Sequence, residues 1–316
     1  MAEYFQNSQI LRNFVAVKWQ KSELSILIPA YNTVCVNMVA ELQKQAEALD
    51  IDYEIIVVDD ASPLHDTVRQ NRVISDMPRC TFIAKQQNSG SAATRNELTA
   101  QSRYRWLLFL DCDMQIPDSR FLERYVSCQQ DGVINGGISI GGNPTELKHC
   151  LRYRYEKREE PNHTAEKRQL RPYQSFRSTN FLAARDVMLR CPFDERFKRS
   201  GYEDVLLGKS FKQQKVTLTH IDNPLVMTDY EKNTDYVVKI ERSLETLHAF
   251  RRELRGYSRL LTLADGIHIA VVRQAIALAF RLCRPLMRRN LCGSRPNLKL
   301  FDIYRIGYFL TLKTVF

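Results

Sequence analysis

The sequence of 316 residues lacks several features that would place it in a special class of protein. None of its eight cysteines belongs to a C-x-x-C pair, and the first ten residues, MAEYFQNSQI, lack the basic-then-apolar pattern of a secretion signal. We therefore expect a cytoplasmic protein with reduced thiols. No stretch approaches the ~18 uncharged apolar residues of a membrane-spanning helix. With 44% apolar and 26% charged residues the composition is that of a globular protein, so extensive disorder is not expected.

Positive charge is concentrated in the last part of the chain. Residues 251–316 contain 13 lysines and arginines but only three acidic residues, and this excess equals the net charge of +10 of the whole chain. Basic segments attract either nucleic acid or the anionic inner leaflet of a membrane.

Residues 266–288 have the pattern of an amphipathic helix. On a helical wheel Arg273, Arg281, Arg284 and Arg288 lie opposite Val272, Ala275, Ile276, Ala279 and Leu286. Pro285 is expected to kink or end this helix, and a second apolar segment follows at residues 303–316. The pattern predicts a helix that lies on a membrane surface. The alternative is a helical cap of the domain whose arginines extend to solvent.

Four short apolar runs in the first part of the chain predict buried parallel strands. They are Leu24 to Ile28, Tyr53 to Val58, Cys80 to Ala84 and Trp106 to Leu110. Segments of helical character separate them, which is the βαβ rhythm of an α/β protein. Because each run ends in a polar cluster, we expect these clusters to share one edge of the sheet.

The middle of the chain is less regular. The residues from Gly132 to Gly142 predict turns around a short strand at residues 138–140, and another strand is expected at residues 178–184. The charge-rich stretch from Leu147 to Arg171 is interpreted as a solvated helix and loop that form a mobile flap rather than part of the core. A helix should begin at Gly201-Tyr202-Glu203-Asp204, and an amphipathic helix within residues 233–255 is expected to pack on the sheet.

Asp111 and Asp113 directly follow the fourth apolar run. Two carboxylates at the carboxyl end of a strand form a candidate site for a hard divalent cation. Such a cation takes its remaining ligands from water and substrate phosphates, so the pair suggests a bound diphosphate. A solvated strand end without a metal is the alternative interpretation.

Six clusters in order make the sequence recognisable. They are residues 25–32, SILIPAYN; residues 57–62, VVDDAS; residues 88–96, NSGSAATRN; residues 110–113, LDCD; Asn180-Phe181; and Phe193-Asp194-Glu195 with residues 201–204, GYED. Together they resemble the family 2 glycosyltransferases that build bacterial surface polysaccharides, over residues 24–230. The resemblance implies a GT-A fold, which is a Rossmann-like nucleotide-binding sheet with helices on both faces. It also implies a nucleotide-sugar donor and an inverting transfer.

The resemblance assigns the donor to the following residues: Pro29, Ala30, Tyr31, Asn32, Asp59, Asp60, Asn88, Gly90, Arg95, Asp111 and Cys112. Asp60 would accept a hydrogen bond from the nucleobase, and Arg95 would contact the donor phosphates or ribose. The alternative for Asp60 is that it only forms a turn after the strand, and the alternative for Arg95 is that it is an exposed helix arginine.

By the same resemblance, Asp113 would bind Mn²⁺ or Mg²⁺ with Asp111 beside it. Asp204 would take the proton from the acceptor hydroxyl, and Glu203 would orient the acceptor. Acidic residues in the first turn of a helix are also favoured by the helix dipole alone, which is the alternative for both.

One residue departs from the family pattern. Relatives commonly have a histidine near the position of Met227 that helps to hold the metal, and a thioether is a poor ligand for a hard cation. Either His220 or Asp229 replaces it, or Asp113, water and phosphate hold the metal alone.

These observations predict an N-terminal extension (1–23), a GT-A domain (24–232) and a basic helical region (233–316). The GT-A domain would divide into a donor half (24–130) and an acceptor half (131–232). We expect a UDP-sugar as donor, a glycan or lipid-linked acceptor, and attachment to the anionic inner face of the cell membrane.

Two other functions compete with this interpretation. A metal-dependent nucleotidyltransferase would need a glycine-rich loop with Lys or Arg after the first strand, where Pro29 to Asn32 stand instead. A nucleic-acid-binding protein would use the basic region, with Tyr304, Tyr308 and Phe309 stacking on bases. We do not expect nucleic acid as a partner.

Overall fold

The computed structural model describes residues 22–198 and 201–312. The predicted N-terminal extension therefore lies almost wholly outside the described residues, as do the last four residues of the predicted segment 303–316. Four strands form one half of the main sheet: β1 (Glu23–Ala30), β2 (Asp52–Asp59), β3 (Cys80–Ala84) and β4 (Trp106–Leu110). They stand in the order β3-β2-β1-β4 and run parallel, which confirms the prediction of four parallel strands.

The other half of the main sheet is built around β8 (Asn180–Ala184). The order continues as β4-β8-β6-β9, with β6 (Val133–Asn135) and β9 (Leu218–His220), and β8 is antiparallel to both of its neighbours. A second sheet contains β5 (Met114–Gln115), β10 (Leu225–Met227) and β7 (Ile138–Ile140). The sequence predicted β7 and β8, but the short strands β5, β6, β9 and β10 were missed.

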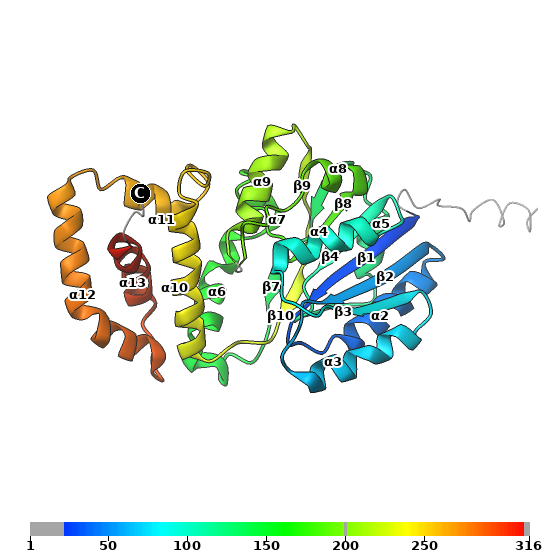
Figure 1. Ribbon diagram of the computed structural model, residues 1–316, viewed down its shortest axis with the longest axis horizontal. Helices are drawn as coiled ribbons and strands as arrows, with labels where there is room; N and C mark the ends of the chain where they lie inside the picture. Colours follow the sequence, from blue (N-terminus) through cyan, green and yellow to red (C-terminus); the bar gives the residue numbers. More distant parts are fainter. Residues whose placement is uncertain (1–21, 199–200, 313–316) are drawn as a thin grey trace, which may run out of the picture.

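Helices cover both faces of the main sheet, as expected. The helix α2 (Val36–Ala48) connects β1 to β2, and α4 (Ser91–Gln101) connects β3 to β4. Because such crossovers are right-handed and the two connections run in opposite directions across the sheet, α2 and α4 lie on opposite faces (Figure 1). The shorter elements α3 (His65–Asn71), η1 (Arg72–Asp76), α5 (Phe121–Val126) and α8 (Arg185–Arg190) complete these layers.

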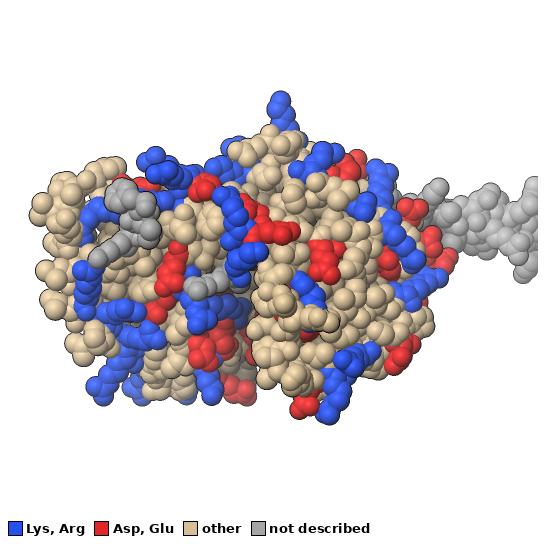
Figure 2. Space-filling model, viewed as in Figure 1, with Lys and Arg blue, Asp and Glu red and all other residues tan. Residues whose placement is uncertain are grey.

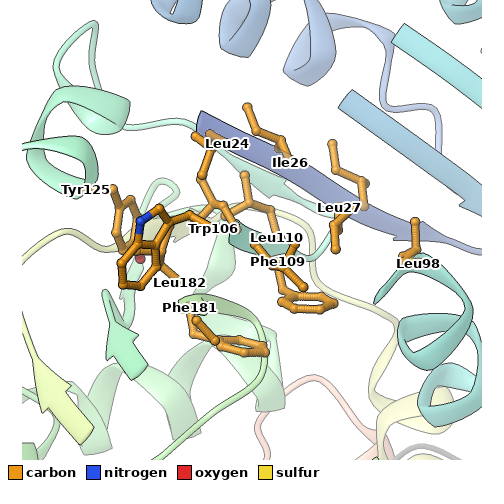
Figure 3. Packing of buried hydrophobic residues seen from close by; sticks show 14 of the residues in the cluster. Leu24, Ile26, Leu27, Leu98, Trp106, Phe109, Leu110, Tyr125, Phe181 and Leu182 are labelled. Carbon is orange, nitrogen blue, oxygen red and sulfur yellow. The ribbon is translucent and has the colours of Figure 1, made fainter. Parts of the chain in front are cut away.

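The centre of the core lies where β1, β4 and β8 meet (Figure 3). All five residues of β4 are buried, because helices cover both faces of the sheet and the strand lies between β1 and β8. The Phe109 and Phe181 rings stack with their centroids 4.7 Å apart, directly across this strand pair. The carboxyl end of β4 is thereby held rigidly, which fixes the position of the acidic residues that follow it.

The charge-rich stretch between residues 147 and 171 is helical, as predicted, but it is anchored to the protein rather than a flap. It forms η2 (Leu147–His149), α6 (Leu151–Glu159), η3 (Glu160–Asn162) and α7 (Ala165–Gln169). Leu151 and Tyr153 are buried, and the buried Arg168 donates from Nη1 to Asn135 Oδ1 at 2.8 Å. Charge density was misleading here, because the charged residues surround a few apolar side chains that anchor the segment.

The C-terminal helices have an apolar core of their own. They are α10 (Asn233–Ala249), α11 (Arg259–Asp265), α12 (Ala270–Cys292) and α13 (Leu298–Thr311). The expectation that α10 packs on the sheet was wrong: its buried residues join Leu151 of α6, Phe280 of α12 and Phe301 of α13. Pro285 does not end α12, which continues to Cys292. This helix forms one outer edge of the molecule (Figure 1).

Two arginines of α12 face the protein rather than a partner. Arg284 and Arg288 donate to the buried carboxylate of Glu241 at 3.0 and 2.8 Å, and the Tyr304 hydroxyl donates to the same carboxylate. Tyr304, together with the equally buried Tyr308, is not available to stack on nucleic-acid bases. Arg284 and Arg288 therefore hold α12 against α10, and the competing idea that Tyr304 and Tyr308 stack on nucleic-acid bases is not supported.

Candidate active site

A cavity of about 590 Å³ opens beyond the carboxyl ends of β1, β2 and β4. It lies where open α/β sheets bind their ligands. Its lining brings together residues from all the predicted clusters except Asn180-Phe181 and Phe193 to Glu195. The predicted residues that line it are Pro29, Ala30, Tyr31, Asp60, Asn88, Gly90, Arg95, Asp111, Cys112, Asp113, Glu203 and Asp204.

The carboxylate of Asp60 anchors the loop that closes one side of the cavity. Its Oδ1 accepts hydrogen bonds from the backbone N–H of Ser89 at 2.9 Å and from Lys85 Nζ at 2.8 Å, and its Oδ2 accepts from the Gly90 N–H at 2.8 Å. Burial alone would raise the pKa of Asp60, but these donors outweigh it and hold the pKa below its usual value. Gly90 has a φ of +89°, and a Cβ there would lie 3.0 Å from the Lys198 carbonyl oxygen, so glycine is needed at this turn.

Asp59 and Asn32 were expected to contact the donor, but they do not line the cavity. Asp59 is fully buried, and its two oxygens accept from the Ser62 N–H at 2.8 Å and the Ser62 hydroxyl at 2.5 Å. The same hydroxyl oxygen accepts from the Asn32 N–H at 2.7 Å. Both residues therefore shape the wall of the cavity from behind, by holding the loop after β1 against the loop after β2.

Arg95 is not an exposed helix arginine. It is 4% exposed, lies in the first turns of α4 and donates from Nη2 to Asp111 Oδ1 at 2.5 Å. Its Nη1 donates to Ser91 Oγ, and its guanidinium carbon lies 5.4 Å from the centroid of the Phe193 ring. Its Nε has no hydrogen-bond partner in the described part of the chain. A buried cation with an unused donor beside the cavity fits an anionic ligand.

The two acidic residues after β4 differ in their surroundings. Asp111 is paired with Arg95, whereas burial, followed by the charge of Asp111, raises the pKa of Asp113. Arg152 and Lys239 partly offset this rise. Carboxylate oxygens that are short of positive charge are suitable ligands for Mg²⁺ or Mn²⁺.

No third protein ligand accompanies this pair among residues 22–198 and 201–312, where no group of three His, Cys, Asp or Glu side chains is arranged to hold a metal. His220 is engaged elsewhere: its Nδ1 lies 2.7 Å from Arg168 Nη1, and its Nε2 lies 2.9 Å from the Pro172 carbonyl oxygen. Met227 is buried within β10, and Asp229 is exposed and outside the cavity lining. Neither His220 nor Asp229 is therefore placed beside Asp113 in the way expected of a replacement for the family histidine.

The opposite side of the cavity is formed by the first turn of α9 (Glu203–Gln213). Glu203 is buried and accepts a hydrogen bond from the Gly201 N–H at 2.6 Å, which ties its side chain to the entry of the helix. Asp204 Oδ1 accepts from the N–H of Val205 at 2.7 Å. Burial and the neighbouring Glu203 raise the pKa of Asp204 to about 7, although Arg177 and Arg95 oppose the shift.

Four lining residues lie outside the recognised clusters and carried no functional signal in the sequence: Thr33, Ser178, Thr179 and Lys198. Tyr202 has a φ of +70°, an unusual backbone conformation for a tyrosine, immediately before the two acidic residues of α9. Hydroxyl groups of this kind are too common in any sequence to be singled out without the fold.

Residues 25–191, more than half of the chain, match the family described as Glycosyl transferase family 2. A protein of Haemophilus influenzae named "Uncharacterized glycosyltransferase" is 34% identical over 138 residues, which cover 39% of this chain and 44% of that relative. The chain thus matches less than half of that relative's length.

Two solved structures also resemble this chain. TarS 1-349 from S. aureus is 16% identical with a TM-score of 0.46, and the match covers 90% of both chains. A mannosyltransferase from Pyrobaculum calidifontis, solved with GDP-Man and Mn²⁺, is 12% identical with a TM-score of 0.49; this match covers 97% of this chain and 92% of that one. The main sheet with helices on both faces and the helical region after it agree with the GT-A architecture expected from the sequence. The match over residues 25–191 establishes that this chain belongs to glycosyl transferase family 2.

Proposed function

We propose that this chain is an inverting glycosyltransferase that uses a nucleoside-diphosphate sugar and a divalent cation. One observation carries the proposal: a single cavity contains a carboxylate pair at the end of β4 and a separate carboxylate at the start of α9. The first suits the diphosphate side of the reaction, and the second suits the acceptor side.

On the donor side, the residues from Pro29 to Tyr31 form the wall against which the nucleobase would lie. Asp60 Oδ2 accepts one hydrogen bond in the structure, so it retains capacity for a base N–H. Arg95 and the carboxylate of Asp111 would contact the ribose and the phosphates. We take a UDP-sugar as the first donor to test.

Asp113 would be the ligand of Mn²⁺ or Mg²⁺, with Asp111 beside it. The bound cation would neutralise the negative charge that gathers on the departing diphosphate. Because the protein contributes only carboxylates from one short segment, we expect cation and nucleotide to bind together rather than independently.

On the acceptor side, Asp204 would accept the proton of the attacking hydroxyl. A bond forms between the acceptor oxygen and the anomeric carbon, and the bond from that carbon to the diphosphate oxygen breaks on the opposite side. The diphosphate leaves with the electron pair, and the configuration at the anomeric carbon inverts. A base with a pKa near 7 is matched to proton transfer at neutral pH.

We further propose that the acceptor is a glycan or a lipid-linked glycan in the synthesis of a surface polysaccharide. The enzyme would then work at the inner face of the cell membrane, where lipid-linked acceptors are present.

The donor and cation requirements are tested by thermal unfolding with UDP-, GDP- and dTDP-sugars, each with and without Mn²⁺. A ligand at 100 times its Kd stabilises the folded state by about 2.7 kcal/mol. Asp113→Asn should abolish most of the Mn²⁺-dependent part of this stabilisation, and calorimetric titration should show the same loss. Asp66→Asn, at an exposed position of α3, is the matched control. Unchanged Mn²⁺-dependent binding in Asp113→Asn would exclude Asp113 as the ligand.

A further inference from the structure

The helix α12 presents an apolar face to solvent. Its inner side packs on the protein through Ala277, Phe280, Met287 and Leu291, which are all buried. The side chains that point the other way form the outward face of α12, namely Val271, Val272, Ala275, Leu278, Ala279, Leu282 and Leu286. Several are far more exposed than is usual for apolar residues, with Val271 at 73%, Leu282 at 74% and Leu286 at 71%. In Figure 2 the corresponding edge of the molecule shows uncharged surface.

This face continues into a groove between α12 and α13. The groove has a volume of about 770 Å³ and no charged residue in its lining, which includes Cys283, Leu286, Leu300 and Ile303. Contiguous apolar surface of this kind usually marks a site of interaction with a protein or a membrane.

The charged residues of α12 itself are all arginines. Residues 266–301 contain seven lysines and arginines and no acidic residue. Arg284 and Arg288 are paired with Glu241, but Arg281 and Arg289 are exposed at the borders of the face. A polyanionic surface is therefore complementary to this part of the molecule.

A basic groove lies at the end of α12. It is lined by Lys148, His149, Arg154, Arg295 and Lys299, together with Pro144, Tyr153, Pro296, Asn297 and Leu298, and contains no acidic side chain. Lys299 of the basic groove is adjacent in the chain to Leu300 of the apolar groove, so the two grooves meet at the first turn of α13.

We propose that the outward face of α12 and the basic groove together dock on a lipid bilayer with anionic headgroups. The apolar side chains lie among the acyl chains near the surface, while Arg295 and Lys299 donate hydrogen bonds to a headgroup phosphate. Among the residues described, no helix is long and apolar enough to span a membrane, and α12 contributes one face only. This inference specifies the contact implied by the proposed membrane location, but it does not depend on the catalytic chemistry.

A second copy of this chain is a poorer occupant of the same surface. In a symmetric pair the same patch meets itself, so the cations around α12 of one copy, such as Arg289 and Arg295, would approach those of the other. An anionic bilayer removes this repulsion.

Removing α12 and α13 is not a clean test, because it would uncover buried residues of α10 such as Val237 and Leu244. Substitutions on the surface of the full-length protein are preferable. The protein is mixed with vesicles of phosphatidylcholine alone or with added phosphatidylglycerol, and the bound fraction is measured by flotation at low and high salt. We expect binding to the anionic vesicles only, weakening as salt is added.

The first variant pair tests the headgroup contact. Arg295→Gln with Lys299→Gln should weaken binding to anionic vesicles about 25-fold, since each basic residue near the surface contributes about 1 kcal/mol. The control is Lys44→Gln with Lys212→Gln, which removes two exposed lysines from the catalytic domain. The headgroup contact would be overturned if the unaltered protein bound neutral vesicles as tightly as anionic ones. It would also be overturned if the control variant lost as much binding as Arg295→Gln with Lys299→Gln.

The second variant pair tests insertion of the apolar face. Leu282→Gln with Leu286→Gln should weaken vesicle binding at least about tenfold at any salt concentration. Leu170→Gln with Leu189→Gln is the control, because these leucines are 82% and 53% exposed but lie away from α12. Unaltered vesicle binding by the α12 variant would overturn the proposal. A dimer in solution would also overturn it, if the dimer dissociates in the α12 variant but persists when vesicles are added to the unaltered protein.

Two further measurements separate possible causes of failure. Millimolar glycerol phosphate should not displace the protein from anionic vesicles; complete displacement would mean that the basic groove binds a soluble phosphate instead. Nucleotide binding and thermal unfolding of every variant should match the unaltered protein, which excludes misfolding. Vesicle binding without any nucleotide binding would contradict the proposed enzyme function but not the docking surface.

Discussion

Replacing Asp204 by asparagine should make the protein more stable and inactive at the same time. In the unfolded chain this carboxyl has an ordinary pKa near 3.8, whereas burial and the charge of Glu203 raise it to about 7 in the folded state. Between these values the folded state holds the proton more tightly, so the carboxyl weakens folding progressively as the pH rises from about 4 to 7. At 1.36 kcal/mol for each pKa unit, ionised Asp204 costs about 4 kcal/mol of folding free energy above pH 7.

Asparagine has the same shape and no charge to bury, so Asp204→Asn should relieve most of this cost. Helix α9 would also lose an acidic residue near its N-terminus, which is worth about 0.3 to 1 kcal/mol in the opposite direction. We therefore expect a net gain of about 3 kcal/mol at pH 8 and almost none at pH 4. Urea unfolding at pH 4, 6 and 8 measures this difference directly.

The effect on catalysis has the opposite sign. Transfer requires the ionised carboxylate, so the rate of the unaltered enzyme should rise through about pH 7 and then level off. Asp204→Asn should retain donor affinity and lose about 100- to 10,000-fold in kcat. Glu203→Gln is the informative comparison, because removing that neighbouring charge should lower the pKa of Asp204 and move the pH profile to lower pH. The reasoning would be refuted if the difference in unfolding free energy between Asp204→Asn and the unaltered protein did not change with pH. Near-normal transfer by Asp204→Asn would refute it as well.

Two other substitutions test the architecture of the site and its support. Lys85→Met should destabilise the protein by about 1.5 to 3 kcal/mol at neutral pH and weaken nucleotide binding, because Asp60 loses its charged partner. Since the pKa of Asp60 is lowered in the folded state, this difference should shrink below about pH 4, which urea unfolding as a function of pH can check. Gly137→Ala should cost more than about 1 kcal/mol in thermal or urea unfolding, because φ is +81° and the new Cβ would lie 2.6 Å from Arg168 Nη2; an alanine variant as stable as the unaltered protein would contradict this.

Local patterns were enough to predict the donor half of the fold. A strand buried on both faces is apolar along its whole length, so the run ending at Leu110 identifies itself without knowledge of its neighbours. The run ending at Ala84 was also predicted as buried, but β3 lies at the edge of the sheet and is only partly buried. The acidic residues after β4 and at the start of α9 could be predicted for the same reason, because their positions follow from where those elements end. Their contacts could not be predicted: the pairing of Arg95 with Asp111 depends on how α4 lies on the sheet.

The wrong predictions have one physical cause. The polarity of a residue and its sequence neighbours does not show which distant side chain it will contact. Asp59 stands beside Asp60 in the sequence, yet only Asp60 reaches the cavity because neighbouring side chains of an extended segment point to opposite sides. The arginines of α12 predicted an amphipathic helix correctly, but Arg284 and Arg288 are occupied by Glu241, which lies in another helix. No periodicity within α12 could have revealed that carboxylate.

The position of β8 between β4 and β6 has a consequence for how the chain folds during synthesis. When residues 24–130 have left the ribosome, β1 to β4 are complete and β4 can pair with β1, but its second neighbour, β8, has not yet been made. Until β8 arrives, β4 would be an edge strand of five apolar residues with unpaired backbone groups, which is a template for aggregation. Transient protection of this edge by a chaperone should therefore govern the yield of soluble protein, and slowing translation between β4 and β8 should lower it.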